Sequence, residues 1–184
     1  DGIDAENGNT VVINGNVTST TDDGVDLITN NTITVGSSGS ITAKDNGIEA
    51  ENGNTVNIFG TVVAEDHGID LGNDDSSTSG GNVVVIHAGA VVRGDPAVKF
   101  DNGGNTLTVL GLLDGGFKAV GQNNEITISS SGSITTTGDS ADGIYNKGDT
   151  NTTTISGSIT TTGDSSDGIK YYGDSNTTTI SGSV

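Results

Sequence analysis

Short aliphatic residues alternate with polar ones along the whole chain, in brief runs that end at Gly, Asn or Asp. The segments 32–35 and 55–58 are typical, because Thr or Asn takes every second position between Ile and Val. A period of two indicates short β-strands with one buried face. No stretch has the spacing of an amphipathic helix. The pattern therefore predicts an all-β protein built from many short strands.

The alternating runs belong to a repeat. A pair made of a small residue and an aliphatic one recurs every 21–29 residues, and the small residues are Gly2, Gly24, Gly47, Gly68, Ala97, Ala119, Gly143 and Gly168. A second strand follows each pair and usually begins with Asn, as at Asn9, Asn31 and Asn54. A third short strand follows a Gly turn, and its leading aliphatic residues are Val17, Ile41, Val62, Val91, Leu113, Ile134, Ile159 and Val184.

Three short strands in each repeat of this length predict a right-handed parallel β-helix of about eight coils. The coils vary between 21 and 29 residues, whereas a left-handed β-helix has shorter and stricter repeats. We expect one β-helix domain over residues 1–184, either a segment of a longer solenoid or a stacking unit without caps. The core would then be a narrow column of stacked aliphatic side chains.

The composition fits a thin core and excludes several functions. Hydrophobic residues make up 30% of the chain, and Gly accounts for 30 residues. The chain has 6 Lys and Arg against 24 Asp and Glu, a net charge of −18. So few basic residues predict no nucleic-acid partner, and no apolar run is long enough to predict membrane insertion. We attribute the negative charge to corner and outward Asp residues, and therefore to a solvated rod surface.

Two near-identical stretches carry a resemblance to a known family. Residues 138–145 read GDSADGIY and residues 163–170 read GDSSDGIK, and each precedes an NTTTISGS unit at 151–158 and 176–183. In these stretches the chain resembles the β-helical passenger region of bacterial autotransporters and of filamentous haemagglutinin-type surface adhesins. The resemblance implies a right-handed β-helix stalk that is secreted to the bacterial cell surface, and it implies no catalytic residue.

The first functional hypothesis is therefore a secreted or cell-surface structural protein that acts in extension, adhesion or head-to-tail filament assembly. Open coil edges offer unpaired strand groups, so we expect end-to-end self-association or a host or cell-surface ligand as partner.

A polysaccharide lyase or hydrolase is the second hypothesis. Residues 65–121 are the irregular part of the repeat and hold both His residues, the one Arg and the one Pro. Carboxylates with nearby cationic or imidazole groups are the residue types that glycoside chemistry uses. The candidate catalytic residues are Asp66, His67, Asp70, Arg93 and Lys99. However, His67 also replaces a corner Asp or Asn of the repeat, which favours a solvated turn.

A Ca²⁺-binding module is a further hypothesis, and Ca²⁺ is the one cofactor that we consider. Hard cations take carboxylate oxygens, and the acidic pairs are Asp22 with Asp23 and Asp74 with Asp75. The competing interpretation is that corner Asp residues are turn formers that bond to their own backbone.

An ice-binding module would present flat ranks of outward Thr. Third-strand residues such as Thr18, Thr135 and Thr160 form such a rank, which we expect Lys44, Glu65 and Arg93 to interrupt. Among the aromatic residues, we expect Phe59, Phe100 and Phe117 to fill the core. Tyr145, Tyr171 and Tyr172 are candidates for an exposed contact patch.

Overall fold

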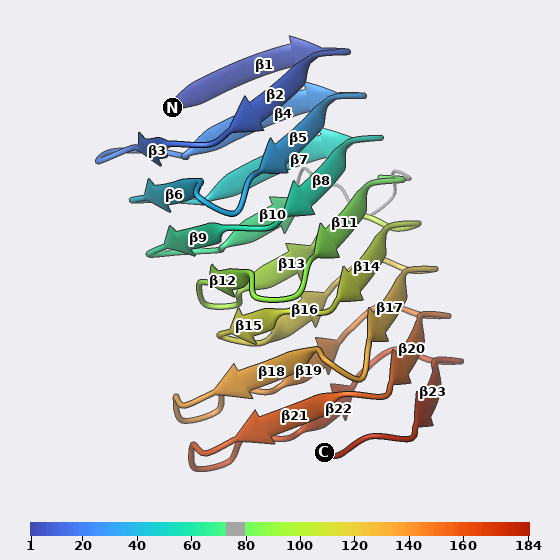
Figure 1. Ribbon diagram of the computed structural model, residues 1–184. Helices are drawn as coiled ribbons and strands as arrows, with labels where there is room; N and C mark the ends of the chain where they lie inside the picture. The colour runs from blue at the N-terminus through green and yellow to red at the C-terminus, as the bar shows by residue number, and fades with distance from the viewer. Residues whose placement is uncertain (73–79) are drawn as a thin grey trace.

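The computed structural model describes residues 1–72 and 80–184, and these residues form parallel strands of three to five residues and no helix. The strands lie in three sheets that wind into a right-handed β-solenoid, with the N-terminus at one end of the rod and the C-terminus at the other (Figure 1). The predicted parallel β-helix with three strands per coil is confirmed.

Each turn contributes one strand to each sheet. The strands of the first sheet are β1 (Ile3–Asn7), β4 (Val25–Thr29), β7 (Ile48–Asn52), β10 (Ile69–Leu71), β13 (Val98–Phe100), β16 (Phe117–Ala119), β19 (Ile144–Asn146) and β22 (Ile169–Tyr171). Those of the second sheet are β2 (Thr10–Ile13), β5 (Thr32–Val35), β8 (Thr55–Ile58), β11 (Val83–Ile86), β14 (Thr106–Val109), β17 (Glu125–Ile128), β20 (Thr152–Ile155) and β23 (Thr177–Ile180). Those of the third sheet are β3 (Asn16–Thr18), β6 (Ser40–Ala43), β9 (Thr61–Ala64), β12 (Val91–Arg93), β15 (Leu112–Asp114), β18 (Ser133–Thr136) and β21 (Ser158–Thr161).

The solenoid has about seven complete turns, slightly fewer than the eight coils predicted. The last turn contains β22 and β23, but its third position holds only an isolated bridge between Ser158 and Ser183. Val184 therefore does not lead a third strand.

Two repeat positions differ from the prediction. The sixth repeat begins at Gly116 and not at Ala119, because Phe117 pairs with Val98. In the same register Ala119 pairs with Phe100, so a small residue leaves room beside a large one. The buried rings of Phe100 and Phe117 then meet edge to face, with centroids 5.1 Å apart. In β12 the inward residue is Val92 and not Val91, because Val92 pairs with Val62.

The core is a column of aliphatic rows, since identical strand positions of successive turns stack on each other. One row runs through Ile33, Val56 and Val84, which are fully buried and in register. Parallel ladders bring the same position of each turn into contact, so β-branched side chains pack against their own kind. A thin core of this type explains how a chain with so few hydrophobic residues folds.

Seven of the eight strands of the first sheet directly follow a Gly, and β13 follows Ala97, because the backbones pass too closely there for a larger side chain. A Cβ placed on Gly47 would lie 2.5 Å from the carbonyl oxygen of Gly68 and would also collide with the Val62 side chain. Gly24 and Gly143 occupy the same position of their turns and face equivalent collisions.

A second kind of corner joins the first sheet to the second. One residue in each turn has a positive φ, and these residues are Gly8, Asn30, Gly53, Gly81, Gly104, Asn123, Thr150 and Ser175. The left-handed region favours Gly and Asn, and these two residue types occupy six of the eight positions, those of the first six turns. Each of them directly precedes an Asn.

These Asn residues form a continuous ladder along the rod. In each step the side-chain Oδ1 of one Asn accepts a hydrogen bond from the backbone N–H of the Asn one turn earlier. The seven steps measure 2.7–2.9 Å and run through Asn9, Asn31, Asn54, Asn82, Asn105, Asn124, Asn151 and Asn176. Six of these residues, from Asn31 to Asn151, are buried. The ladder therefore pairs a row of backbone donors that strand pairing does not reach.

Replacing Asn54 with Ala should lower the free energy of unfolding by about 2–3 kcal/mol, because it leaves the buried N–H of Asn31 without its acceptor. It also removes the side-chain amide that donates to the carbonyl of Ile28 at 3.1 Å. Urea unfolding followed by circular dichroism measures the change. Asn9→Ala is the matched control, since the exposed Asn9 joins the ladder through its backbone N–H. Equal losses in the two variants would contradict a stabilising role for the ladder.

Candidate functional site

One outward position of the first sheet forms a row along the rod in which seven of eight residues are charged. Strand register places one such residue per turn, and the row, in order, is Asp4, Asp26, Glu49, Asp70, Lys99, Lys118, Tyr145 and Lys170. We call it the outer charged row. Neighbouring strands lie roughly 4.8 Å apart, so the members of the row lie next to one another along the rod. The first four members are acidic, and three of the last four are basic.

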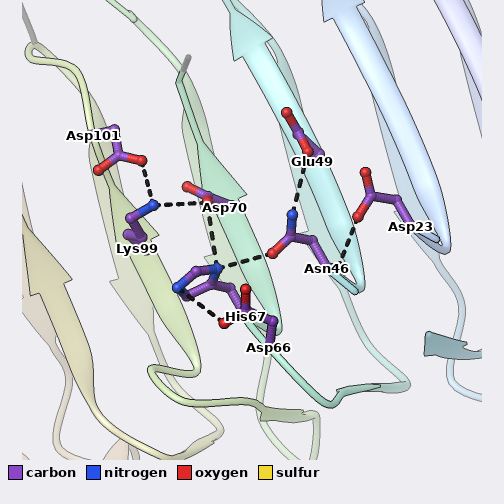
Figure 2. A network of polar contacts seen from close by, with 8 residues as sticks. All are labelled: Asp23, Asn46, Glu49, Asp66, His67, Asp70, Lys99 and Asp101. Carbon is purple, nitrogen blue, oxygen red and sulfur yellow. Dashed lines mark hydrogen bonds and ion pairs between the residues drawn. The ribbon is translucent and has the colours of Figure 1, made fainter. Parts of the chain in front are cut away.

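The middle of this row opens into a hollow of about 370 Å³, which we call the acidic hollow. Its lining residues are Asp45, Asn46, Glu49, Asp66, His67, Asp70, Gly72, Lys99 and Asp101. They come from three successive turns, at the start of β7, β10 and β13 and at the corners that precede or follow them (Figure 2).

Lys99 and His67 connect the carboxylates of the hollow. Lys99 Nζ lies 3.1 Å from Asp70 Oδ2 and 2.5 Å from Asp101 Oδ2. His67 Nδ1 lies 2.9 Å from Asn46 Oδ1 and 3.4 Å from Asp70 Oδ2 (Figure 2). Since the amide oxygen of Asn46 only accepts, Nδ1 carries the proton and donates it. Asp70 Oδ1 is buried and has no hydrogen-bond partner among the described residues.

Burial shifts the protonation of these groups. It raises the pKa of Asp70 to about 7, and the carboxylate of Asp101 adds to this while the neighbouring Lys99 opposes it. Burial also raises the pKa of Glu49 to about 7, with further contributions from Asp23 and Asp70. The pKa of His67 is lowered by burial, so the ring is mainly neutral near pH 7. The hollow therefore holds carboxyl groups that exchange protons near neutral pH.

The predicted catalytic residues are only partly brought together. Asp66, His67, Asp70 and Lys99 line the same hollow. Arg93 does not, because it lies on β12 in the third sheet and its Nε pairs with Asp114 Oδ2 at 2.7 Å. Arg93 therefore lies apart from the other four candidates, at an outward position of the third sheet.

His67 does occupy a corner position, as the repeat predicts, but its side chain is only 14% exposed. It stacks above Asn46, whose backbone N–H donates to Asp23 Oδ1 at 2.8 Å. The expectation of a solvated turn is therefore wrong for His67.

The corner Asp residues also differ from the expectation. Their side chains accept from the backbone of the next turn rather than from their own backbone. Asp142 Oδ1 accepts from the N–H of Asp167 at 2.8 Å, and Asp149 Oδ1 accepts from Asp174 at 2.7 Å. Asp23, Asp70 and Asp101 are moreover buried, so part of the negative charge is not on a solvated surface.

Sequence reasoning missed Asn46, Glu49 and Asp101. Glu49 follows Gly47 and Ile48 as Asp70 follows Gly68 and Ile69, so alignment of equivalent repeat positions finds it. Asn46 lies in the corner column of His67. Both belong to regular repeats, so no irregularity of the sequence distinguishes them from turn formers.

The Ca²⁺ candidates Asp22 and Asp23 lie with Asp1 in a cluster whose carboxylate oxygens are within 4.8 Å of one another. Asp74 and Asp75 lie outside the described residues. Ca²⁺ binding therefore stays a prediction.

The third-sheet Thr rank is interrupted by Arg93, as expected, and also by Val63 and Asp114. Lys44 and Glu65 form an ion pair just beyond the strands of this sheet.

A more regular Thr array covers the outer face of the second sheet, and sequence reasoning missed it. Each strand of this sheet has two outward residues, at its first and third positions. Of these sixteen positions eleven are Thr, three are Val, and the others are Asn57 and Glu125. We call this surface the threonine face. Its 16 positions contain one charged residue, in a protein of net charge −18.

The aromatic predictions are partly confirmed. Phe100 and Phe117 are buried, but Phe59 is 41% exposed and stacks on His87, with ring centroids 3.7 Å apart. Phe59 follows β8 at an outward position, which is why it leaves the core. Tyr145 and Tyr172 lie 5.5 Å apart near the C-terminal end, and a contact patch there stays a prediction.

Comparison with models of known families, with curated proteins and with solved structures finds no match. Among the residues that the structure describes, no helix is long and apolar enough to cross a membrane.

Replacing Glu49 with Gln should stabilise the protein above pH 7 and have little effect near pH 4. The folded state raises the pKa of Glu49 from 4.5 to about 7, so it binds this proton more tightly than the unfolded chain does. Wild-type stability therefore falls as the pH rises through that window, and Gln removes this loss. Because solvent screens part of this carboxyl, we expect an advantage of about 1 kcal/mol at pH 8.

Urea unfolding of both proteins between pH 4 and pH 8 measures the difference. Glu125→Gln removes an exposed carboxyl on the second sheet and should leave the pH profile unchanged. A constant difference between Glu49→Gln and wild type across this range would contradict the prediction.

Proposed function

We propose that this chain is a rigid structural and adhesive segment of a secreted or cell-surface protein, and that it makes contact through the threonine face. The observation that carries the proposal is the segregation of charge. Most acidic residues lie on the first sheet and at the corners, while the outer face of the second sheet carries one charged residue, Glu125.

The shape of the solenoid supports a role in extension. Turns stack in register at roughly 4.8 Å per turn, so the described turns form a rod on the order of 35 Å long. The Asn ladder and the aliphatic rows join every turn to the next. Such a rod keeps a contact face at a constant distance from its point of attachment.

The threonine face supports a role in adhesion. Its hydroxyl and methyl groups form a two-dimensional array, with a period of roughly 4.8 Å along the rod and roughly 6.7 Å along each strand. Thr108 and Thr154 are typical members, and none of the sixteen positions is buried. A flat and regular array of this kind complements a flat, neutral and repeating partner, such as the surface of a polysaccharide fibre. Stacked Thr side chains present both hydrogen-bonding and apolar contacts to it.

The resemblance to autotransporter passengers and haemagglutinin-type adhesins agrees with this proposal. It suggests the bacterial surface as the location and a host or cell-surface ligand as the partner. End-to-end association of solenoids would add reach without changing the contact face.

A sedimentation assay with crystalline cellulose and chitin tests the proposal. Wild-type protein should be retained, and Thr127→Lys should weaken retention by about fivefold, because it places a charge in the middle of the face. Thr135→Lys is the matched control on the third sheet and should bind as wild type does. Retention on ice alone, with thermal hysteresis, would assign the face to ice binding and overturn polysaccharide adhesion. Absence of retention on every solid would overturn the adhesive role.

A second candidate function is hydrolysis or lysis of a polysaccharide in the acidic hollow. The observation that favours it is the convergence of Asp66, His67, Asp70 and Lys99, with Asp70 protonated up to about pH 7. A carboxyl group that holds its proton near neutral pH acts as a general acid toward a glycosidic oxygen.

Release of reducing or unsaturated sugar ends from neutral and acidic glycans tests this candidate. If it is correct, Asp70→Asn should reduce the rate by at least about 100-fold, as loss of a general acid does. Arg93→Ala should retain full activity, because Arg93 lies apart from the hollow. Wild-type protein that releases no sugar ends from any of these glycans would exclude it.

A further inference from the structure

The outer charged row changes sign once, and it does so between Asp70 and Lys99. The row is acidic on the N-terminal side of this step, and its charged members are basic on the C-terminal side. Three of the six basic residues of the chain lie in it. Lys118 forms no ion pair within the described part of the chain, and its ammonium lies 6.0 Å from the Tyr145 ring centroid. The ammonium of Lys118 is therefore available to pair with an anionic group outside the chain.

We propose that a second copy of the chain is this partner, and that two rods pair antiparallel through the outer faces of their first sheets. The two-fold axis would lie in the interface, perpendicular to the rods and level with the step between Asp70 and Lys99. This symmetry places the acidic half of each row opposite the basic half of the other. A parallel arrangement would instead place like charges opposite each other.

The register determines which residues meet. Counting outward from the axis, Asp70 lies opposite Lys99 of the second copy, but these two residues are mostly buried and already pair within each chain at 3.1 Å. The next residue, Glu49, faces Lys118 of the second copy and forms the new ion pair. Each of these pairs occurs twice, because the interface is symmetric. Glu49 and Lys118 are separated within one chain by the two turns that carry Asp70 and Lys99. They do not meet within one chain, so a contact between them forms only in the dimer.

The outer positions of the row are also compatible with antiparallel pairing. Asp26 faces Tyr145 of the second copy, and a phenol donates a hydrogen bond to a carboxylate. Asp4 faces Lys170, which Asp142 and Asp167 already hold at 3.3 and 3.4 Å. The outermost pair therefore contributes less than the Glu49 and Lys118 pair.

The area of the paired faces and the repulsion between charges elsewhere determine the affinity of the dimer. A face of eight stacked strands of three to five residues covers roughly 500 Å² per copy, so the interface is at the weak end of specific ones. The long Lys118 side chain reaches Glu49, which lines the acidic hollow of the other copy. Charges on the other faces repel, but at physiological ionic strength the Debye length is about 8 Å and screens them. We expect a dissociation constant on the order of 10 μM.

Sedimentation equilibrium from about 1 to about 200 μM protein tests the proposal. Wild type should form dimers and no larger species through this face. Glu49→Lys and Lys118→Glu should each weaken self-association by at least about tenfold, because each creates two like-charge contacts. An equimolar mixture of the two variants should recover the wild-type affinity, since the heterodimer restores opposite charges in both pairs. Circular dichroism should show that both variants are folded, because each substitution reduces the repulsion between like charges in neighbouring turns of its own row.

Lys44→Glu and Glu125→Lys change the net charge by the same amounts on other faces and should dimerise as wild type does. A wild type that stays monomeric over the whole range, or a mixture that fails to recover the affinity, would overturn the proposal. The proposal goes beyond the adhesive function and uses a different face. Glu49→Lys should therefore still bind to polysaccharide. Loss of dimerisation and loss of polysaccharide binding are separate results, so each proposal can fail without the other.

Discussion

The fold depends on one hydrogen bond that is repeated at every turn, from the backbone N–H of one Asn to the side chain of the Asn one turn later. Strand pairing satisfies the backbone within the three sheets, but the corner between the first and second sheets leaves a further backbone donor, which is buried in six turns. Only a short side chain with an acceptor can reach it, and Asn also has an amide that donates to nearby carbonyls. The ladder thereby determines where each second strand begins.

The same stacking that supports the ladder gives the outer charged row its properties. In a parallel solenoid, equivalent positions must contact each other, so like residues stabilise a row of Asn or Val and destabilise a row of carboxylates. Asp26, Glu49 and Asp70 all have raised pKa values, with burial as the main cause and neighbouring carboxylates adding to it. The change of sign at Lys99 relieves this repulsion, because its ammonium pairs with Asp70 and Asp101.

Periodicity alone was sufficient to predict the class of fold, the three strands per turn and most strand positions. It failed at Ala119 because packing around Phe100 and Phe117 determines the register there, and a pattern of small and aliphatic residues does not record ring geometry. Four of the nine residues that line the acidic hollow could be identified from the sequence, because they lie in the irregular part of the repeat, residues 65–121. Asn46 and Glu49 were not identified, because contact between turns joins residues more than twenty positions apart.

Because each turn contacts only the turns next to it, such a chain can change its length by whole turns. Residues 138–159 and 163–184 differ at only six of 22 positions, and the strands of both stretches pair in the same register. Recombination between the two copies would delete or duplicate a whole turn while it leaves each junction chemically the same. Rods that differ by roughly 4.8 Å steps could thus arise within a lineage without any new packing interface.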